Sequence, residues 1–165
     1  MRDSDDDGLT DDELADDSPR RPERAVLRDT RAVYRLADKA YAPFSCPASG
    51  ECCQLSTTQR QPWLWRNEWL VLKERLSAQG RALPPPRADG GCPLLDAAGK
   101  RCTVYEDRPF GCRTFFCQRI TGPSRQPREE VIRLSLRLEV LSQELDPELK
   151  GPRQILDWAR EEREG

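Results

Sequence analysis

The chain has 165 residues, of which 34% are charged; it contains seven cysteines and no histidine. This length suits one domain with appendages, and the lack of histidine excludes hydrolases built on a Ser-His-Asp or Cys-His arrangement. The net charge of -2 hides an uneven distribution, because residues 1–17 hold nine acidic side chains and Arg2 whereas the other 148 residues carry a net charge of +6.

The N-terminal segment offers almost nothing to bury, so we expect residues 1–22 to be a disordered acidic tail. Within it, residues 3–13 resemble a calcium-binding loop, with Asp at loop positions 1, 3 and 5 and Gly at position 6. Position 12, where a bidentate Glu belongs, is Leu14. We therefore interpret the segment as a solvated tail and not as a calcium site.

Two amphipathic helices are predicted in the first half of the chain. Apolar side chains recur at helical spacing in residues 22–41, interrupted only by Thr30. A second helix is predicted to begin at Gln61-Pro62 and to end at Gly80. Its apolar stripe consists of Trp65, Trp69, Leu72 and Leu76. We interpret these tryptophans as core and not as a stacking platform for nucleic acid.

The middle of the chain is predicted to be irregular apart from one hairpin. Residues 81–91, with three consecutive prolines and two glycines, should form an extended connector. Residues 92–95 and 101–105 flank a turn in which Gly99 supplies a positive φ. Such a hairpin can bring Cys92 and Cys102 side by side.

The C-terminal region is predicted to be helical. Residues 127–145 fit both a strand alternation and a helical stripe, but the start at Pro127 and the stop at Asp146-Pro147 favour a helix. A last helix over residues 153–162 should dock through Ile155 and Trp158. The predicted fold is therefore small α+β and mostly α, with helices around a cysteine-rich hairpin and turn.

The expected organisation is a tail over residues 1–22 and a single domain over residues 23–163. Within that domain, a cysteine-cluster core spans residues 44–118 and C-terminal helices span residues 127–163. The chain shows no apolar signal region and no run long enough to span a bilayer, so we expect a cytoplasmic protein without membrane association.

The cysteines are the main chemical feature of the sequence. All of them lie within residues 46–117: Cys46, Cys52, Cys53, Cys92, Cys102, Cys112 and Cys117. In a reducing compartment, clustered cysteines are more often metal ligands or redox groups than disulfides. Adjacent cysteines in an extended segment point to opposite faces, so Cys52 and Cys53 could share one centre only if the chain bends there.

The spacing resembles the YkgJ-type cysteine-cluster family, whose members carry the description zinc- or iron-chelating. The resemblance rests on Cys46-x2-Ser49-x2-Cys52-Cys53, Cys92-Pro-Leu-Leu, Cys102-Thr-Val-Tyr-Glu, Arg108-Pro109 and Cys112-Arg113-x-Phe-x-Cys117. It covers roughly residues 44–118 and implies a metal bound by all seven cysteines or a subset of them. The family pattern has a cysteine where this chain has Ser49, and a neutral hydroxyl is a poor substitute for a thiolate.

We expect Cys92, Cys102, Cys112 and Cys117 to form the main thiolate set, with Cys52 or Cys53 able to replace one member. Arg108 and Arg113 are candidates for offsetting the charge of four thiolates, which is -2 with Zn(II). The chain lacks the C-x2-C knuckles common at zinc sites, so the spacing favours an iron-sulfur cluster or iron, with zinc as the alternative.

The expected function is therefore metal binding, with the metal or cluster as ligand, a protein partner left open and no nucleic acid. The sequence does not decide whether the protein is an enzyme. One alternative is a thiol redox protein in which Cys112 and Cys117, or Cys52 and Cys53, cycle between dithiol and disulfide. Two others are a methylase-related activity, suggested by similar cysteine groups in bacterial protein lysine methylases, and an interaction module shaped by a structural metal.

Overall fold

The computed structural model describes residues 21–165 of the chain, and the predicted tail with its calcium-like loop lies almost wholly outside this range. Four helices of ten or more residues dominate: α1 (Glu23–Tyr41), α3 (Arg66–Ala78), α5 (Arg128–Leu145) and α6 (Ile155–Glu164). The shorter elements are η2 (Glu51–Cys53), α2 (Leu55–Thr58), β1 (Trp63–Leu64), η3 (Tyr105–Asp107), α4 (Phe110–Arg113) and β2 (Arg153–Gln154). The prediction of a small, mostly α, α+β fold is confirmed.

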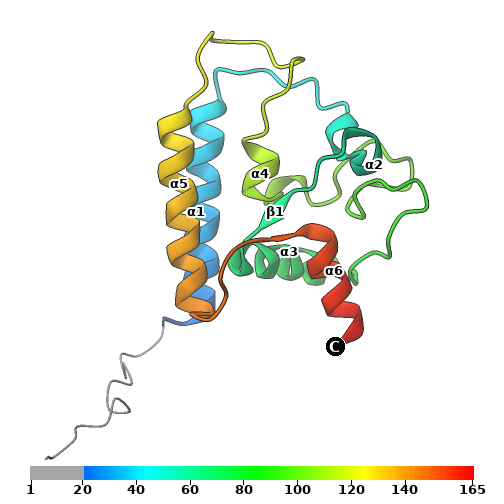
Figure 1. Ribbon diagram of the computed structural model, residues 1–165, viewed down its shortest axis with the longest axis vertical. Coiled ribbons are helices and arrows are strands. Elements are labelled where there is room, and N and C mark those ends of the chain that lie inside the picture. Colours follow the sequence, from blue (N-terminus) through cyan, green and yellow to red (C-terminus); the bar gives the residue numbers. More distant parts are fainter. Residues whose placement is uncertain (1–20) are drawn as a thin grey trace, which may run out of the picture.

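Helices α1 and α5 lie side by side, and α3 crosses near one end of the pair (Figure 1). The helix predicted over residues 22–41 is confirmed, with Val26, Val33 and Ala37 buried. Thr30 is also fully buried, because its hydroxyl donates to the Val26 carbonyl and accepts a 2.8 Å hydrogen bond from the Asn67 amide. The polar interruption in the stripe is thus a satisfied contact between α1 and α3.

The helical interpretation of residues 127–145 is also confirmed, with Pro127 preceding α5. Leu134, Leu138 and Leu141 are buried against α1 and α3, together with Val71 and Phe110. The alternation that suggested a strand runs over Ile132, Leu134, Leu136, Leu138 and Val140, of which Leu134 and Leu138 are buried while Ile132, Leu136 and Val140 are exposed. The apparent alternation arose because both faces of α5 carry apolar side chains.

The predicted start of the second helix at Gln61-Pro62 is wrong, because α3 begins at Arg66. Residues 63–64 instead form β1, which pairs antiparallel with β2 in the register Trp63↔Gln154 and Leu64↔Arg153. The last helix likewise begins at Ile155, after β2. This two-strand pairing links segments far apart in the sequence, so no local pattern could predict it.

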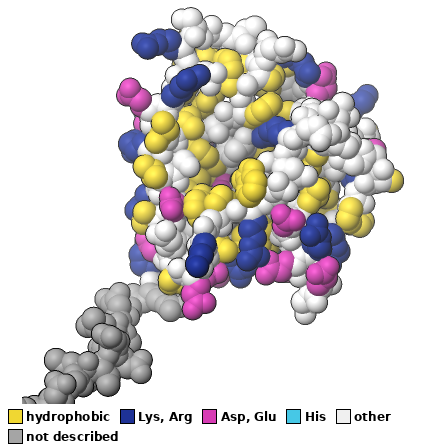
Figure 2. All heavy atoms as spheres, viewed as in Figure 1, with side chains coloured by type: hydrophobic (Ala, Val, Ile, Leu, Met, Phe, Trp, Pro, Cys, Tyr) yellow, Lys and Arg dark blue, Asp and Glu magenta, His cyan; other side chains and the backbone are white. Residues whose placement is uncertain are grey.

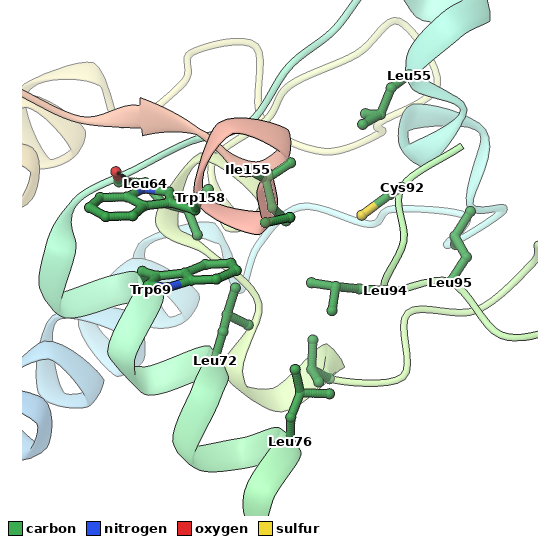
Figure 3. Packing of buried hydrophobic residues seen from close by; sticks show 12 residues of the cluster. Leu55, Leu64, Trp69, Leu72, Leu76, Cys92, Leu94, Leu95, Ile155 and Trp158 are labelled. Atoms are coloured by element: carbon green, nitrogen blue, oxygen red, sulfur yellow. Dashed lines mark hydrogen bonds between the residues drawn. The ribbon is translucent and has the colours of Figure 1, made fainter. Parts of the chain in front are cut away.

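A second apolar cluster forms where α3, α6 and the middle loops meet. Trp69 and Trp158 stack there with ring centroids 6.0 Å apart, and the Trp158 indole donates to the Leu64 carbonyl. The core role predicted for Trp69, Ile155 and Trp158 is confirmed. The Cys92 side chain belongs to the same cluster, and Figure 3 shows it between the side chains of Leu55 and Leu94. One cysteine is therefore anchored in the apolar core.

Most of the cysteine-bearing loops lie on the side away from the α1–α5 pair, near α2 (Figure 1). On the face in Figure 2, basic and acidic side chains alternate and apolar groups lie between them. Within residues 21–165, none of the helices combines the length and the apolar character needed to cross a bilayer.

Candidate metal centre

A tight turn presents the adjacent Cys52 and Cys53 on one side of the chain. Both belong to the 3-10 turn η2, which follows Gly50 at φ +73°. A Cβ atom at Gly50 would lie 2.5 Å from the Lys100 carbonyl oxygen, so only glycine allows this close approach. The Cys52 and Cys53 sulfurs are 4.0 Å apart. The local bend that would let both cysteines face one centre is therefore present.

The hairpin predicted around Gly99 is present as a single antiparallel bridge between Leu95 and Cys102. The Asp96 amide donates to the Arg101 carbonyl, and Gly99 has a φ of +69°. At the start of this segment, the Cys92 amide donates a 2.8 Å hydrogen bond to the Cys53 carbonyl. This bond joins the first cysteine group directly to the second.

The short helix α4 carries Cys112. Its first residue is fixed by Glu68 of α3, whose carboxylate accepts a 2.7 Å hydrogen bond from the Phe110 amide. The same carboxylate accepts from the Trp65 amide and the Tyr34 hydroxyl. Burial raises the pKa of Glu68 to about 7, although these hydrogen bonds oppose the shift. A buried acid thus positions the helix that holds Cys112.

Five cysteines lie on segments that bond to one another: Cys52 and Cys53 in η2, Cys92 and Cys102 at the ends of the hairpin segment, and Cys112 in α4. Burial, with a smaller contribution from neighbouring thiols, raises the pKa of Cys92 to about 12 and that of Cys112 to about 11. Burial likewise raises the pKa of Cys102. Without a cation these three thiols are neutral near pH 7.

Cys52 differs from the other four. The Cys53 thiol donates to its sulfur and lowers the pKa of Cys52 to about 6, with a further contribution from the Arg60 charge. The pKa of Cys53 rises correspondingly, because it keeps its proton for that hydrogen bond. The pair therefore holds one negative charge near neutral pH, beside the three neutral buried thiols.

Cys46 and Cys117 lie on the segments that flank this group. Cys46 is exposed, and neither residue is among the principal charges that act on the five thiols. Their segments pair through a bridge between Ser45 and Thr121. Helix α4 ends at Arg113, so Cys117 does not share a helix with Cys112. The structure joins the Cys53 backbone to that of Cys92, and the expected place of Cys117 in the main thiolate set stays a prediction.

Cysteine thiolates are ligands of zinc, iron and iron-sulfur clusters, and one centre takes about four of them. In residues 21–165, however, no three Cys, Asp or Glu side chains are already placed to coordinate one metal ion. Binding would therefore require the thiols to rotate toward a common point. Cys52, Cys53 and Cys102 are partly buried, whereas Cys92 is buried.

The arginines expected to offset thiolate charge are engaged elsewhere as well. Arg113 donates to Asp38 at 2.5 Å and lies 4.3 Å over the Tyr34 ring, while Arg108 lies 3.9 Å over the Tyr105 ring. Both still lower the pKa of Cys102. The sequence analysis missed Arg60, which contacts the Cys52 and Gly111 carbonyls. No spacing or motif distinguished it from the other arginines.

Comparison with protein families matches residues 45–132 to the CxxCxxCC family, described as a putative zinc- or iron-chelating domain. The match covers more than half of the chain and includes all seven cysteines. Neither a search of curated proteins nor a search of solved structures gave a match.

Proposed function

Since the chain belongs to the CxxCxxCC family of zinc- or iron-chelating domains, we propose that it binds a metal through four of the five cysteines on the joined segments. The observation that carries this proposal is that three cysteine-bearing segments are joined directly: the Cys92 amide bonds to the Cys53 carbonyl, and Arg60 bonds to the Cys52 and Gly111 carbonyls. The candidate ligands are Cys52, Cys53, Cys92, Cys102 and Cys112. Cys46 and Cys117 are assigned no role as ligands in this centre.

The charge pattern supports a cation at this point. Buried thiols keep their protons because an isolated thiolate is poorly solvated, and a divalent cation removes that cost by direct coordination. Cys52 carries the single negative charge of the Cys52 and Cys53 pair, so its thiolate would be the first ligand of an incoming cation. The remaining thiols then lose their protons as they coordinate, so binding should release protons to the solvent.

The wide and irregular cysteine spacing favours an iron-sulfur cluster or iron over zinc, as expected from the sequence. A bound zinc ion would supply a cross-link between the segments, and a bound iron-sulfur cluster would also supply electron transfer. In either case the residues of the chain hold the centre between the apolar cluster around Cys92 and the solvent.

The test is anaerobic purification followed by measurement of metal, of acid-labile sulfide and of visible absorption. Brown protein with iron and sulfide in equal amounts would select the iron-sulfur cluster. Iron without sulfide would select an iron ion, and colourless protein with one zinc per chain would select zinc. Protein that cannot be loaded with zinc, with iron, or with iron and sulfide together would overturn the proposal.

One observation favours a second function, that of a thiol redox protein. The Cys52 and Cys53 sulfurs are 4.0 Å apart, and Cys52 has a pKa of about 6, so it is a thiolate at neutral pH. Such a thiolate is more reactive than an ordinary cysteine. Metal-free protein that transfers two electrons per chain to a disulfide reagent and regains its thiols on reduction would favour this alternative.

A further inference from the structure

Arg60 spans the two segments that bring Cys52 and Cys112 together. One guanidinium nitrogen donates a 2.7 Å hydrogen bond to the Gly111 carbonyl, directly before Cys112 in the chain. The other donates a 3.4 Å hydrogen bond to the Cys52 carbonyl. The guanidinium also lies 4.1 Å from the centre of the Phe115 ring. The side chain is thus held on three sides, and each contact lies at or beside a cysteine-bearing segment.

Arg60 differs from Arg108 and Arg113 in what it contacts. Its guanidinium bonds to the carbonyls at and beside Cys52 and Cys112, whereas Arg108 bonds to the Tyr105 carbonyl and Arg113 bonds to the Arg108 carbonyl and to Asp38. Four thiolates around Zn(II) leave a net charge of -2, and a nearby cation that also donates hydrogen bonds stabilises such a centre. Arg60 combines this charge with direct bonds to the backbone that carries the ligands.

We propose that Arg60 is a positioning residue of the metal centre, which fixes the Cys52 and Cys112 segments at the separation that metal binding requires and offsets the charge of their thiolates. This inference rests on the proposed function. It adds a residue that lies outside the cysteine pattern and is not itself a ligand.

The contacts of Arg60 require a guanidinium group at this position. A guanidinium is planar and presents several N–H groups in a fixed fork, so it can bond two carbonyls while it lies over an aromatic ring. Lysine keeps the positive charge but has a single ammonium group at the end of a flexible stem. Arg60→Lys should therefore recover only part of what Arg60→Gln loses.

The experiment is a cobalt(II) titration of metal-free, reduced protein, followed through the sulfur-to-cobalt charge-transfer absorption, with zinc competition to give the affinity. The variants are Arg60→Gln, Arg60→Lys and the control Arg153→Gln. Arg153 also lies over an aromatic ring, 4.9 Å from the centre of Trp158, but it is not among the charges that act on the five thiols. Circular dichroism of each variant checks that it is folded.

We expect Arg60→Gln to weaken zinc binding by about tenfold to 100-fold, the usual cost of losing a group that orients metal ligands. Arg60→Lys should fall between Arg60→Gln and wild type, and Arg153→Gln should match wild type. Wild-type affinity in either Arg60 variant, or an equal loss in Arg153→Gln, would overturn the inference while leaving metal binding intact. A wild-type protein that binds neither cobalt nor zinc would remove the inference together with zinc chelation as its basis.

Discussion

The backbone amide of Cys92 donates a hydrogen bond to the backbone carbonyl of Cys53, 2.8 Å away. The bond joins two cysteine groups that a helix and an extended connector separate in the sequence. Because it is a backbone bond, it depends on the path of both segments and not on the thiols. The Cys53 and Cys92 segments are therefore held side by side by the fold.

Replacement of Cys112 by Ser should reduce bound metal to nearly zero, because Cys112 interacts with the other thiols and a serine hydroxyl is a poor ligand for zinc or iron. Cys46→Ser is the matched control, since Cys46 is exposed and lies outside the thiol group. Metal analysis of both purified variants gives the comparison. Equal metal content in the two variants would contradict the assignment of the centre.

Removal of the metal under reducing conditions should loosen the cysteine loops before the helices. The loops depend on single backbone bonds, such as the one between Cys92 and Cys53, whereas α1 and α5 share a buried apolar interface. If the metal contributes a few kcal/mol, Tm should fall by roughly 5–10 °C.

Hydrogen exchange with and without a chelator checks this second prediction. Faster exchange should be confined to residues 50–56, 90–104 and 110–113, with the amides of α1 and α5 as the internal control. Unchanged exchange in the loops after metal removal would mean that the metal does not hold them.

The buried Glu68 predicts a pH dependence of stability. Its pKa is about 7 in the folded protein, against 4.5 when unperturbed, because burial disfavours the charged form. The folded state therefore binds this proton more tightly than the unfolded state. The resulting stability is fully present below about pH 4.5 and is lost as the pH rises through about 7, by roughly 3 kcal/mol in total.

Urea unfolding across this pH range, with Glu68→Gln beside wild type, measures the effect. The variant should be less stable overall. The two carboxylate oxygens of Glu68 accept from the Phe110 and Trp65 backbone amides, and in glutamine one of these oxygens is replaced by an NH2 group, which cannot accept. Its stability should nevertheless change less with pH. Glu129→Gln, at an exposed position of α5, should keep the wild-type slope. Parallel curves for Glu68→Gln and wild type would refute this prediction.

Ser49→Cys restores the family spacing but should not raise the metal capacity. The Ser49 hydroxyl accepts a hydrogen bond from Arg119 at 3.4 Å, and Cys46 in the same loop is exposed. Neither residue is among the proposed ligands, so the new thiol should react as a free one with a thiol reagent in the metal-loaded protein. A second equivalent of metal in this variant would show that the flanking loop forms its own site.

The sequence by itself determined the helices and the choice of chemistry. Residues 22–41 and 127–145 carry apolar side chains at helical spacing. This spacing is a local signal, read from residues within a few turns of one another, so the sequence alone indicates α1 and α5. The cysteine pattern likewise identified the family, because the spacing of the ligands is itself part of the sequence. Gly99 also indicated the turn of the hairpin, because a positive φ favours glycine.

Only the tertiary structure decided how the cysteine-bearing segments are joined. Cys52 and Cys53 join the hairpin cysteines through the turn at Gly50 and the bond to Cys92, while α4 is placed by the buried carboxylate of Glu68 on α3. Arg60 and the pairing of β1 with β2 also escaped prediction. The physical reason is common to all of them, because each contact joins segments that are distant in the chain. Local periodicity predicts where a helix forms but not how the helices pack, and their packing determines which segments come into contact.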